Sequence, residues 1–297
     1  MKKLAITVLA AATALTLAAC SAQPSANSGS TNGAASSSGT GVVAQIKSRG
    51  QINIADCLSF KPFGFYNSSG KPDGYDVDLA NLLAKSLGVK ANVVNVTSDN
   101  RIPYLQTGKV DAVFCNFTIT GQRAQAVDFT IPYVVSGEGV LVRKSANIRS
   151  ASDLNGKTVA VTKGSTNAQA VQAVAPHATV QAYNDDTSAM QAVKSGQADA
   201  FIEDLNFLTY QASQNTSLDL LKTTLGAKEY NGWAVQKGDK ALLDYLNSFL
   251  RKVTENGQSL KLFKKWFGAA PLYPLNYTTS DPTSGLDLVK TAESSNG

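Results

Sequence analysis

The sequence is poor in the residues that most metal sites and many catalytic sites require. Its 297 residues include one histidine, His177, and three cysteines, Cys20, Cys57 and Cys115, none of them in a CxxC pair. This set lacks the ligands of a tetrahedral zinc site, and it argues against Ser-His-Asp or Cys-His catalysis. Neither a GxxxxGK[ST] loop nor a GxGxxG turn is present, so the usual phosphate cradles are missing. We therefore expect no metal, no cofactor and no nucleotide chemistry.

Composition and charge narrow the class of protein further. Hydrophobic residues make up 43% of the chain and charged residues only 16%, which is typical of folded domains rather than disordered chains. The length corresponds to about two domains. The formal net charge is +5, and without Lys2 and Lys3 it is about +3, from 25 basic against 22 acidic residues. Such a weak, dispersed charge argues against a nucleic-acid partner.

The N-terminus has the features of an export signal. A basic start, Met1-Lys2-Lys3, precedes an apolar run over 4–17 that is too short for a membrane-spanning helix. The run ends in Leu17-Ala-Ala-Cys20, which resembles the lipobox of bacterial lipoproteins and implies a lipid on Cys20. The alternative is an ordinary signal cleaved after an alanine. We expect a signal peptide over 1–19, a Ser/Gly-rich tether over 20–41, and a polar tail over 269–297.

Between 42 and 268, short β-branched runs alternate with helical patterns, which predicts an α/β fold with parallel strands and crossover helices. Leu79, Leu82, Leu83 and Leu87 share one face of a helix that we expect to begin at Asp76 as its N-cap and to end at Gly88. Further helices are predicted at 99–106, 121–126, 166–175, 186–195, 204–212 and 242–253. Strands are predicted at 51–56, 92–96, 110–115, 138–143, 157–162, 178–182, 199–203 and 231–236.

One pattern occurs twice, 88 residues apart. Residues 105–116 (LQTGKVDAVFCN) and 193–204 (VKSGQADAFIED) both read as a helix ending at glycine, an Asp-Ala strand start, and a polar residue at the strand end. The polar residues are Asn116 and Asp204, and open α/β sheets bind ligands at the carboxyl ends of their strands. Either this pattern recurs by chance, or it marks two similar lobes that face one cleft.

Three segments offer charged or polar groups to such a cleft. Thr120 is placed to cap a helix that carries Arg123, whose guanidinium would suit a carboxylate. The segment 161–167 is a strand, a glycine and a helix start, which favours an anion or is a simple cap. Asp204 either receives an ammonium group or caps the next helix.

The ordered motifs of this chain closely resemble those of the family 3 bacterial extracellular solute-binding proteins, the amino-acid receptors of ABC importers. The resemblance covers about 42–268. Its motifs are KPFGF at 61–65, GYDVDLA at 74–80, RIPYLQTGKVDA at 101–112, TITGQR at 118–123, VDFTIPY at 127–133, LNGKTV at 154–159, KGST at 163–166 and KKWF at 264–267.

This resemblance implies a two-lobed periplasmic-binding-protein fold of type II, with two hinge crossings. Lobe 1 would comprise 42–134 plus 231–268, and lobe 2 would comprise 135–230. The implied ligand-binding residues are Phe60, Arg101, Asn116, Thr118, Arg123, Thr166 and Asp204.

The resemblance also implies a role for each of these residues. Arg123, Thr118 and the Thr166 N–H would bind an α-carboxylate, and Asp204 with the Asn116 main chain would bind an α-ammonium group. Phe60 would form an aromatic wall. A second aromatic of many members is absent, since Ser98 stands at that position.

Arg101 resembles an arginine of members that bind acidic amino acids or cysteine. Two arginines against one aspartate would leave a positive charge in the cleft, which an acidic ligand side chain would neutralise. The alternative is that Arg101 pairs with Asp99 or Glu138.

Cys57 and Cys115 lie near the ends of strands that this fold sets side by side. They are either a disulfide, which an extracytoplasmic site permits, or two buried thiols.

The expected function is therefore that of a non-enzymatic, lipid-anchored, extracytoplasmic receptor. It would be a monomer that captures a small polar or acidic L-amino acid by lobe closure and delivers this amino acid to an ABC permease. The alternatives are a cyclohexadienyl-dehydratase-like enzyme or a sensory lipoprotein on the same scaffold. An enzyme would need a general acid, and Glu203, the only unassigned acid beside the cleft, is expected to point away from it by strand alternation.

Overall fold

The computed structural model describes residues 41–275, so the expected signal peptide, nearly all of the tether with Cys20, and most of the tail lie outside the described residues. The helices are α1 (Val42–Arg49), α2 (Tyr75–Leu87), α3 (Arg101–Gln106), α4 (Gly121–Ala126), η1 (Ala151–Leu154), α5 (Asn167–Val174), α6 (Asp186–Ser195), α7 (Leu205–Gln214), α8 (Lys240–Glu255) and α9 (Gln258–Phe267). The strands are β1 (Gln51–Asp56), β2 (Ser59–Phe60), β3 (Gly64–Tyr66), β4 (Pro72–Asp73), β5 (Lys90–Asn95), β6 (Ala112–Thr118), β7 (Val127–Arg143), β8 (Thr158–Thr162), β9 (Thr179–Tyr183), β10 (Ala200–Asp204), β11 (Leu218–Leu220) and β12 (Leu225–Gln236).

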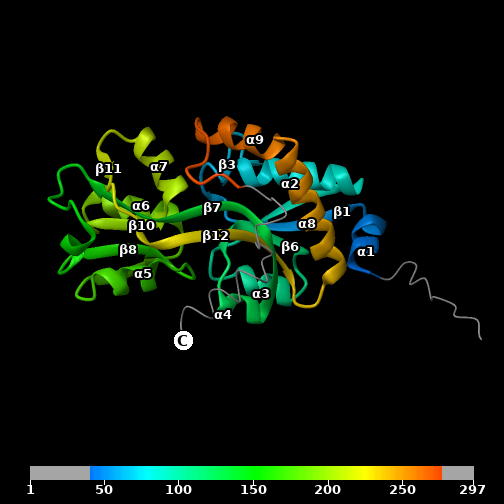
Figure 1. Ribbon diagram of the computed structural model, residues 1–297, viewed down its shortest axis with the longest axis horizontal. Coiled ribbons are helices and arrows are strands. Elements are labelled where there is room, and N and C mark those ends of the chain that lie inside the picture. The colour runs from blue at the N-terminus through cyan, green and yellow to red at the C-terminus, as the bar shows by residue number, and fades with distance from the viewer. Residues whose placement is uncertain (1–40, 276–297) are drawn as a thin grey trace, which may run out of the picture. The chain divides into compact units, whose positions relative to one another are not determined.

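A nine-stranded sheet runs through residues 41–275 in the order β5-β1-β6-β12-β7-β10-β8-β9, with β11 beside β7 (Figure 1). Strands β5, β1 and β6 are parallel to one another, and so are β10, β8 and β9. We refer to the elements around β5, β1 and β6 as lobe 1, and to those around β10, β8 and β9 as lobe 2. The predicted α/β class with parallel strands is thus confirmed within each lobe.

Two long antiparallel strands, β7 and β12, join the lobes at the centre of the sheet. Only their ends were predicted, as strands over 138–143 and 231–236. The sequence prediction missed the rest because β7 contains Pro132, Gly137 and Gly139, residues that ordinarily mark the end of a strand. Shifts in the β12 register near Gly232 similarly interrupt the strand pattern.

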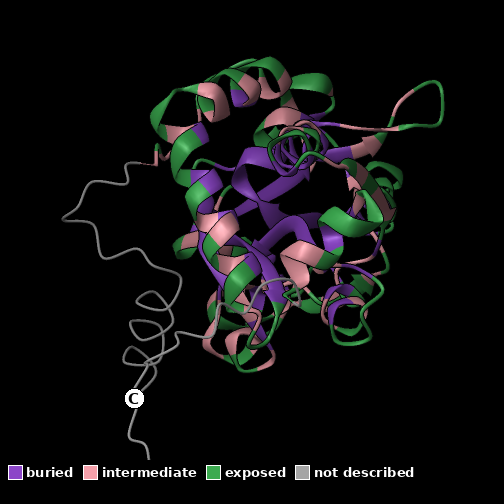
Figure 2. Ribbon diagram, turned by 90° about the vertical axis from the view of Figure 1, so that its right-hand side faces the viewer, coloured by how far each residue is buried: buried purple, intermediate pink, exposed green. Residues whose placement is uncertain are grey.

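The helices cover this sheet on both faces. In Figure 1, α2 and α9 lie above the lobe 1 strands and α3 and α4 below them. The central strands are buried, and the outer helix faces are exposed (Figure 2). At the centre of lobe 1, the ring of Trp233 stacks on Phe114 with centroids 3.7 Å apart, and both side chains are fully buried.

Most predicted boundaries agree with the structure, and α4 and α6 do so residue for residue. Helix α2 ends at Gly88, which has φ 74° and donates its N–H to carbonyls of the last turn, as expected. The predicted N-cap at Asp76 is wrong. Helix α2 starts at Tyr75, after Gly74, and the buried Asp76 carboxylate accepts a hydrogen bond from the Tyr133 hydroxyl instead. Helices α1 and α9 were not predicted.

Candidate functional site

A pocket lies between the two lobes, and we call it the interlobe pocket. All seven ligand-binding residues implied by the sequence line it: Phe60, Arg101, Asn116, Thr118, Arg123, Thr166 and Asp204. The rest of its lining is formed by Cys57, Ser98, Cys115, Ser165, Asn167, Asp186, Glu203 and Glu229.

Arg123 reaches the pocket from the first turn of α4. The Thr120 hydroxyl caps this helix by accepting the Arg123 N–H at 3.2 Å, as predicted. The guanidinium donates to the Thr118 carbonyl at 2.7 Å and to the Gly164 carbonyl of lobe 2 at 2.9 Å. Burial lowers the pKa of Arg123 to about 10, so the group remains positively charged at neutral pH.

Arg101 lies at the start of α3 and is only 3% exposed. Its guanidinium donates to three carbonyl oxygens: Ser98 at 2.8 Å, Cys115 at 3.1 Å and Gly164 at 3.0 Å. Burial and the charge of Arg123 lower its pKa well below the usual range. Within residues 41–275 it makes no ion pair with Asp99 or Glu138, so that alternative is not what the structure contains.

Asp204 ends β10 and is 4% exposed. Its Oδ1 accepts the main-chain N–H groups of Asn206 at 2.8 Å and Phe207 at 3.1 Å, so it caps α7. Its Oδ2 accepts the side-chain amides of Asn116 at 3.0 Å and Asn231 at 3.5 Å. Burial is the main cause that raises the pKa of Asp204. The two roles left open by the sequence are therefore compatible, because each oxygen faces a different side.

Asn116 was expected at the carboxyl end of a strand, but it lies inside β6, which continues to Thr118. Its backbone φ is 41°, and that of Cys115 is 45°, a left-handed conformation that side chains other than glycine rarely adopt. The Asn116 N–H donates to the Tyr133 hydroxyl at 3.1 Å, and the Cys115 N–H donates to Asp56 at 3.3 Å. Buried polar groups from neighbouring elements thus hold this irregular backbone.

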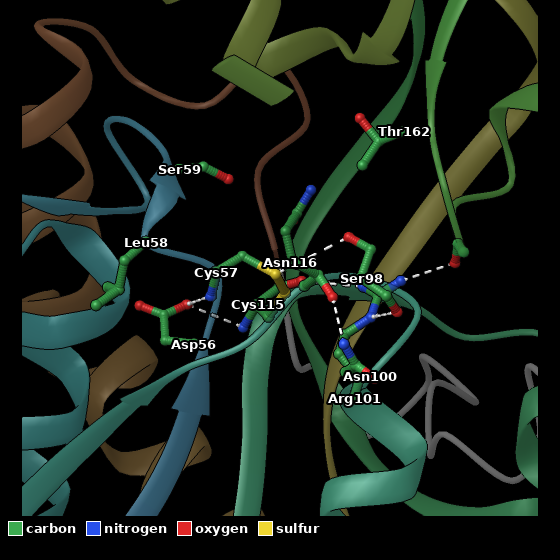
Figure 3. Close-up of a disulfide and its surroundings, with 12 residues drawn as sticks. Asp56, Cys57, Leu58, Ser59, Ser98, Asn100, Arg101, Cys115, Asn116 and Thr162 are labelled. Atoms are coloured by element: carbon green, nitrogen blue, oxygen red, sulfur yellow. Dashed lines mark hydrogen bonds between the residues drawn. A yellow bond between two sulfur atoms is a disulfide. The ribbon is translucent and has the colours of Figure 1, made fainter. Parts of the chain in front are cut away.

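Cys57 and Cys115 form a disulfide on the pocket wall, with Cα atoms 4.8 Å apart (Figure 3). Asp56 Oδ1 accepts the N–H groups of both cysteines (Figure 3). Ser98 lies beside the bond, with its Oγ 3.9 Å from Cys57 Sγ. The end of β1, the segment before α3 and the middle of β6 therefore meet at this wall.

Phe60 lines the pocket, and its ring also contacts lobe 2. It stacks on Phe207 of α7 with centroids 4.2 Å apart and an interplanar angle of 5°. On the same side, the Gln211 amide donates to the Lys61 carbonyl at 2.7 Å. The lobes are thus in contact around the pocket.

Thr166 and Thr118 both contact buried carboxyl groups. The Thr166 hydroxyl donates to Glu138 Oε1 at 2.9 Å rather than capping α5, and the Thr118 hydroxyl donates to Glu229 at 3.5 Å. Glu138 lies on β7 and Glu229 on β12, and the two carboxyl groups interact electrostatically. Burial raises the pKa of both carboxyls, and the neighbouring Glu229 charge raises that of Glu138 further.

Two more acids, Asp186 and Glu203, line the pocket. Asp186 accepts the Thr162 hydroxyl at 2.7 Å, and Glu203 accepts the Asn167 amide at 2.7 Å. Burial raises the pKa of Asp186 to about 6 and that of Glu203 well above its usual range.

These acids correct two sequence arguments. Glu203 lines the pocket beside Asp204, because the chain turns from β10 into α7 here and strand alternation no longer separates neighbours. Asp186, Glu203 and Glu229 line the pocket together with Asp204, so Asp204 is not the single acid that shares the pocket with the two arginines.

Residues 41–275 contain no cluster of three or more side chains suited to hold a metal ion. None of the helices in this part of the chain is long and apolar enough to cross a membrane.

Comparison with known proteins identifies the family. Residues 52–269 match the bacterial extracellular solute-binding proteins, family 3. The chain belongs to this family. It is 34% identical over 277 residues to the ABC transporter glutamine-binding protein GlnH of Bacillus subtilis, covering 91% of this chain and 99% of that protein. It is 37% identical over 235 residues to a glutamine-binding protein of Geobacillus stearothermophilus, covering 76% and 88%.

Solved structures of amino-acid-binding proteins share the fold. The ancestral amino-acid-binding protein AncCDT-1, described as a precursor of cyclohexadienyl dehydratase, superposes with a TM-score of 0.72 at 38% identity, covering 76% of this chain and 99% of the other. The predicted two-lobed fold is thereby confirmed. As a family 3 solute-binding protein, the chain is an extracytoplasmic binding protein, as expected from its sequence.

Proposed function

We propose that this protein binds an L-amino acid between its two lobes and delivers it to an ABC permease. The observation that carries the proposal is the pairing of charges across the interlobe pocket. Arg123 on lobe 1 and Asp204 on lobe 2 line the same pocket, so one zwitterion would meet an opposite charge at each end. Thr118 and the Thr166 N–H would assist the carboxylate, and the Asn116 main chain the ammonium group.

Two further acids of the pocket, Asp186 and Glu203, favour a ligand side chain that donates hydrogen bonds. Phe60 and Ser98 also line the pocket. A carboxylate side chain would meet these acids unfavourably. The pocket therefore suits an amide or a cationic group better than the acidic side chain considered from the sequence. Relatives described as binding glutamine, L-cystine and arginine span this range.

The two lobes would act as a clamp. We propose the boundaries expected from the sequence, with 42–134 plus 231–268 as lobe 1, 135–230 as lobe 2, and hinges in β7 and β12. A ligand that contacts both lobes binds the closed form preferentially, and this difference in affinity is what shifts the hinge equilibrium.

We also propose that the mature protein is a monomer, held at the outer face of a membrane by a lipid on Cys20. The support is the motif at 17–20 and the Ser/Gly-rich stretch that follows it. That stretch would allow the clamp to reach a membrane-bound permease.

The test is a calorimetric titration of the mature chain with each of the twenty amino acids. We expect saturable binding of one or a few L-amino acids with amide or cationic side chains, and recovery of the ligand chemically unchanged. Arg123→Ala should weaken binding about a hundredfold with the fold retained, because it leaves a carboxylate without its partner. The control is Arg149→Ala, which removes an exposed arginine that does not line the pocket.

Several outcomes would count against the proposal. They are the absence of binding to any amino acid, equal affinity in Arg123→Ala, or conversion of the ligand to a product. The last would favour the dehydratase-like alternative, for which the AncCDT-1 likeness is the motivating observation.

A further inference from the structure

The turn between β8 and α5 contacts the lobe 1 backbone at Gly164. This residue has φ +77°, and a Cβ atom built on it would lie 2.6 Å from the N and Cα atoms of Asp99 and 2.8 Å from the carbonyl carbon of Ser98. Main-chain atoms cannot move aside as a flexible side chain can. Any side chain at this position would therefore hold the two lobes apart.

The Gly164 carbonyl oxygen is also the acceptor for both arginines of the pocket. Arg101 donates to it at 3.0 Å and Arg123 at 2.9 Å. Both guanidiniums lie over the same Phe117 ring, with their central carbons 4.1 and 4.8 Å from its centroid. Two lobe 1 cations thus meet at a single lobe 2 oxygen, next to the pocket that they line.

This arrangement makes closure dependent on an anion. Bringing two guanidiniums to one neutral carbonyl in a buried site is opposed by their mutual repulsion. The lowered pKa of Arg101, caused by burial and by the charge of Arg123, agrees with that repulsion. A carboxylate bound to Arg123 would offset it, so the lobes would close most favourably on a ligand that carries one.

We propose that Gly164 acts as a closure latch. Its Cα, which carries no side chain, packs against Ser98–Asp99, and its carbonyl oxygen accepts hydrogen bonds from Arg101 and Arg123 once a ligand carboxylate is present. Arg101 is then a positioning residue that acts through the latch rather than a contact for the ligand side chain. The inference rests on the proposed function, because the ligand supplies the carboxylate.

The hydrogen bonds of Arg101 agree with this role. Its Nε and both terminal nitrogens are engaged with carbonyls of Ser98, Cys115 and Gly164. These acceptors lie on both sides of the lobe contact. The side chain therefore links α3, β6 and the lobe 2 turn, and its loss should affect every ligand equally.

A matched pair of glycine variants tests the latch. Gly156, in the turn before β8, has φ +74°, and a Cβ atom there would meet nothing within 4 Å. Gly164→Ala and Gly156→Ala therefore carry the same backbone strain, but only the first creates a clash between lobes. We expect Gly164→Ala to weaken amino-acid binding about tenfold or more, mainly through faster dissociation, and to give a larger radius of gyration by small-angle X-ray scattering. Gly156→Ala should match the wild type in both measurements.

Arg101→Lys provides a second test that does not depend on the glycine variants folding. It keeps the charge but cannot bridge three carbonyls. We expect about tenfold weaker binding for every amino acid that the wild type binds, with their rank order unchanged. Loss confined to one class of side chain would overturn the proposal, because it would make Arg101 a specificity contact.

The two proposals fail in different ways. If the wild type binds amino acids and Gly164→Ala binds as tightly as Gly156→Ala, the latch is wrong and the receptor function stands. If the wild type binds no amino acid, the receptor function is wrong. The latch, which requires a ligand carboxylate, is then wrong as well.

Discussion

Asp204 performs two tasks with its two carboxylate oxygens. Oδ1 caps α7 through the N–H groups of Asn206 and Phe207, while Oδ2 lies toward the pocket amides. Asn and Asp are about equally good N-caps, and alanine costs about 1 kcal/mol at such a position. Substitutions at this residue can therefore separate stability from binding.

We expect Asp204→Asn to keep the thermal stability of the wild type and to weaken amino-acid binding about a hundredfold, because the ammonium group loses its counter-charge. Asp204→Ala should weaken binding similarly and also lower the free energy of unfolding by about 1 kcal/mol. Calorimetric titration and thermal unfolding measure the two effects. Tight binding by Asp204→Asn would show that this carboxylate does not hold the ligand.

The sequence predicted which residues line the site better than it predicted the charge of the site. The seven residues implied by the family resemblance all line the pocket, because ordered motifs carry their positions. Asp186 and Glu229 were missed because each lies in a separate element with no motif of its own around a functional acid. Only the fold brings these acids into the pocket. The sequence motifs therefore could not predict the charge of the residues that line it.

At the scale of elements, a buried acid supports the wall formed by β1 and β6. Asp56 is 1% exposed and lies near the fully buried Asp76. Burial raises the pKa of Asp56 from 3.8 to about 6, against the lowering effect of the Cys57 and Cys115 N–H groups. The folded protein therefore binds this proton more tightly than the unfolded chain does, and stability is lost as the pH rises from about 4 through 6.

Asp56→Asn should remove this part of the pH dependence while keeping an oxygen acceptor for both N–H groups. We compare the free energy of unfolding of the variant with that of the wild type at each pH. As the pH rises from 4 to 7, this difference should shift in favour of the variant by about 2–3 kcal/mol. Urea unfolding at several pH values measures it, with the exposed Asp219→Asn as a control expected to follow the wild-type profile. Parallel profiles for Asp56→Asn and wild type would contradict a protonated Asp56.

The elements that sequence patterns predicted least well are the ones that join the lobes. Helices with a clear apolar face and a glycine stop, such as α2, were predicted to within a residue or two. Strand β7 was not, because a Pro-Tyr step and two glycines interrupt the residue types of a strand. Its backbone instead obtains its partners from β10, β11 and β12, which lie far away in the sequence.

At the scale of the whole described body, closure depends on contacts that no local pattern encodes. Phe60 stacks on Phe207, and Gln211 donates to the Lys61 carbonyl, across sequence separations of about 150 residues. Such long-range pairs form only when β7 and β12 bring the lobes together. The same closure buries Glu138 between Glu229 on the neighbouring hinge strand and Thr166 of lobe 2.

The Glu138–Glu229 pair should couple closure to a proton. Glu138 Oε1 accepts from Thr166, while Oε2 is buried without a hydrogen-bond partner, and burial and the Glu229 charge raise the Glu138 pKa well above its usual range. Asp204, Arg123 and Glu203 are the other charged groups facing this pair. Opening would expose Glu138 and return its pKa toward 4.5, so the closed form binds the proton more tightly than the open form does. Ligand binding, which favours the closed form, should therefore weaken as the pH rises above about 4.5.

Glu138→Gln isolates this effect because glutamine resembles the protonated acid. Its Oε1 can still accept from Thr166, so closure is preserved without a titrating group. Calorimetry in two buffers of different ionisation enthalpy should show that the wild type takes up protons when it binds the ligand. The number of protons taken up by the variant should be smaller, by up to about one. The variant should also bind more tightly than the wild type at high pH and about equally at low pH. Equal proton uptake in both proteins would mean that closure does not bury a protonated Glu138, since no other difference separates the two side chains.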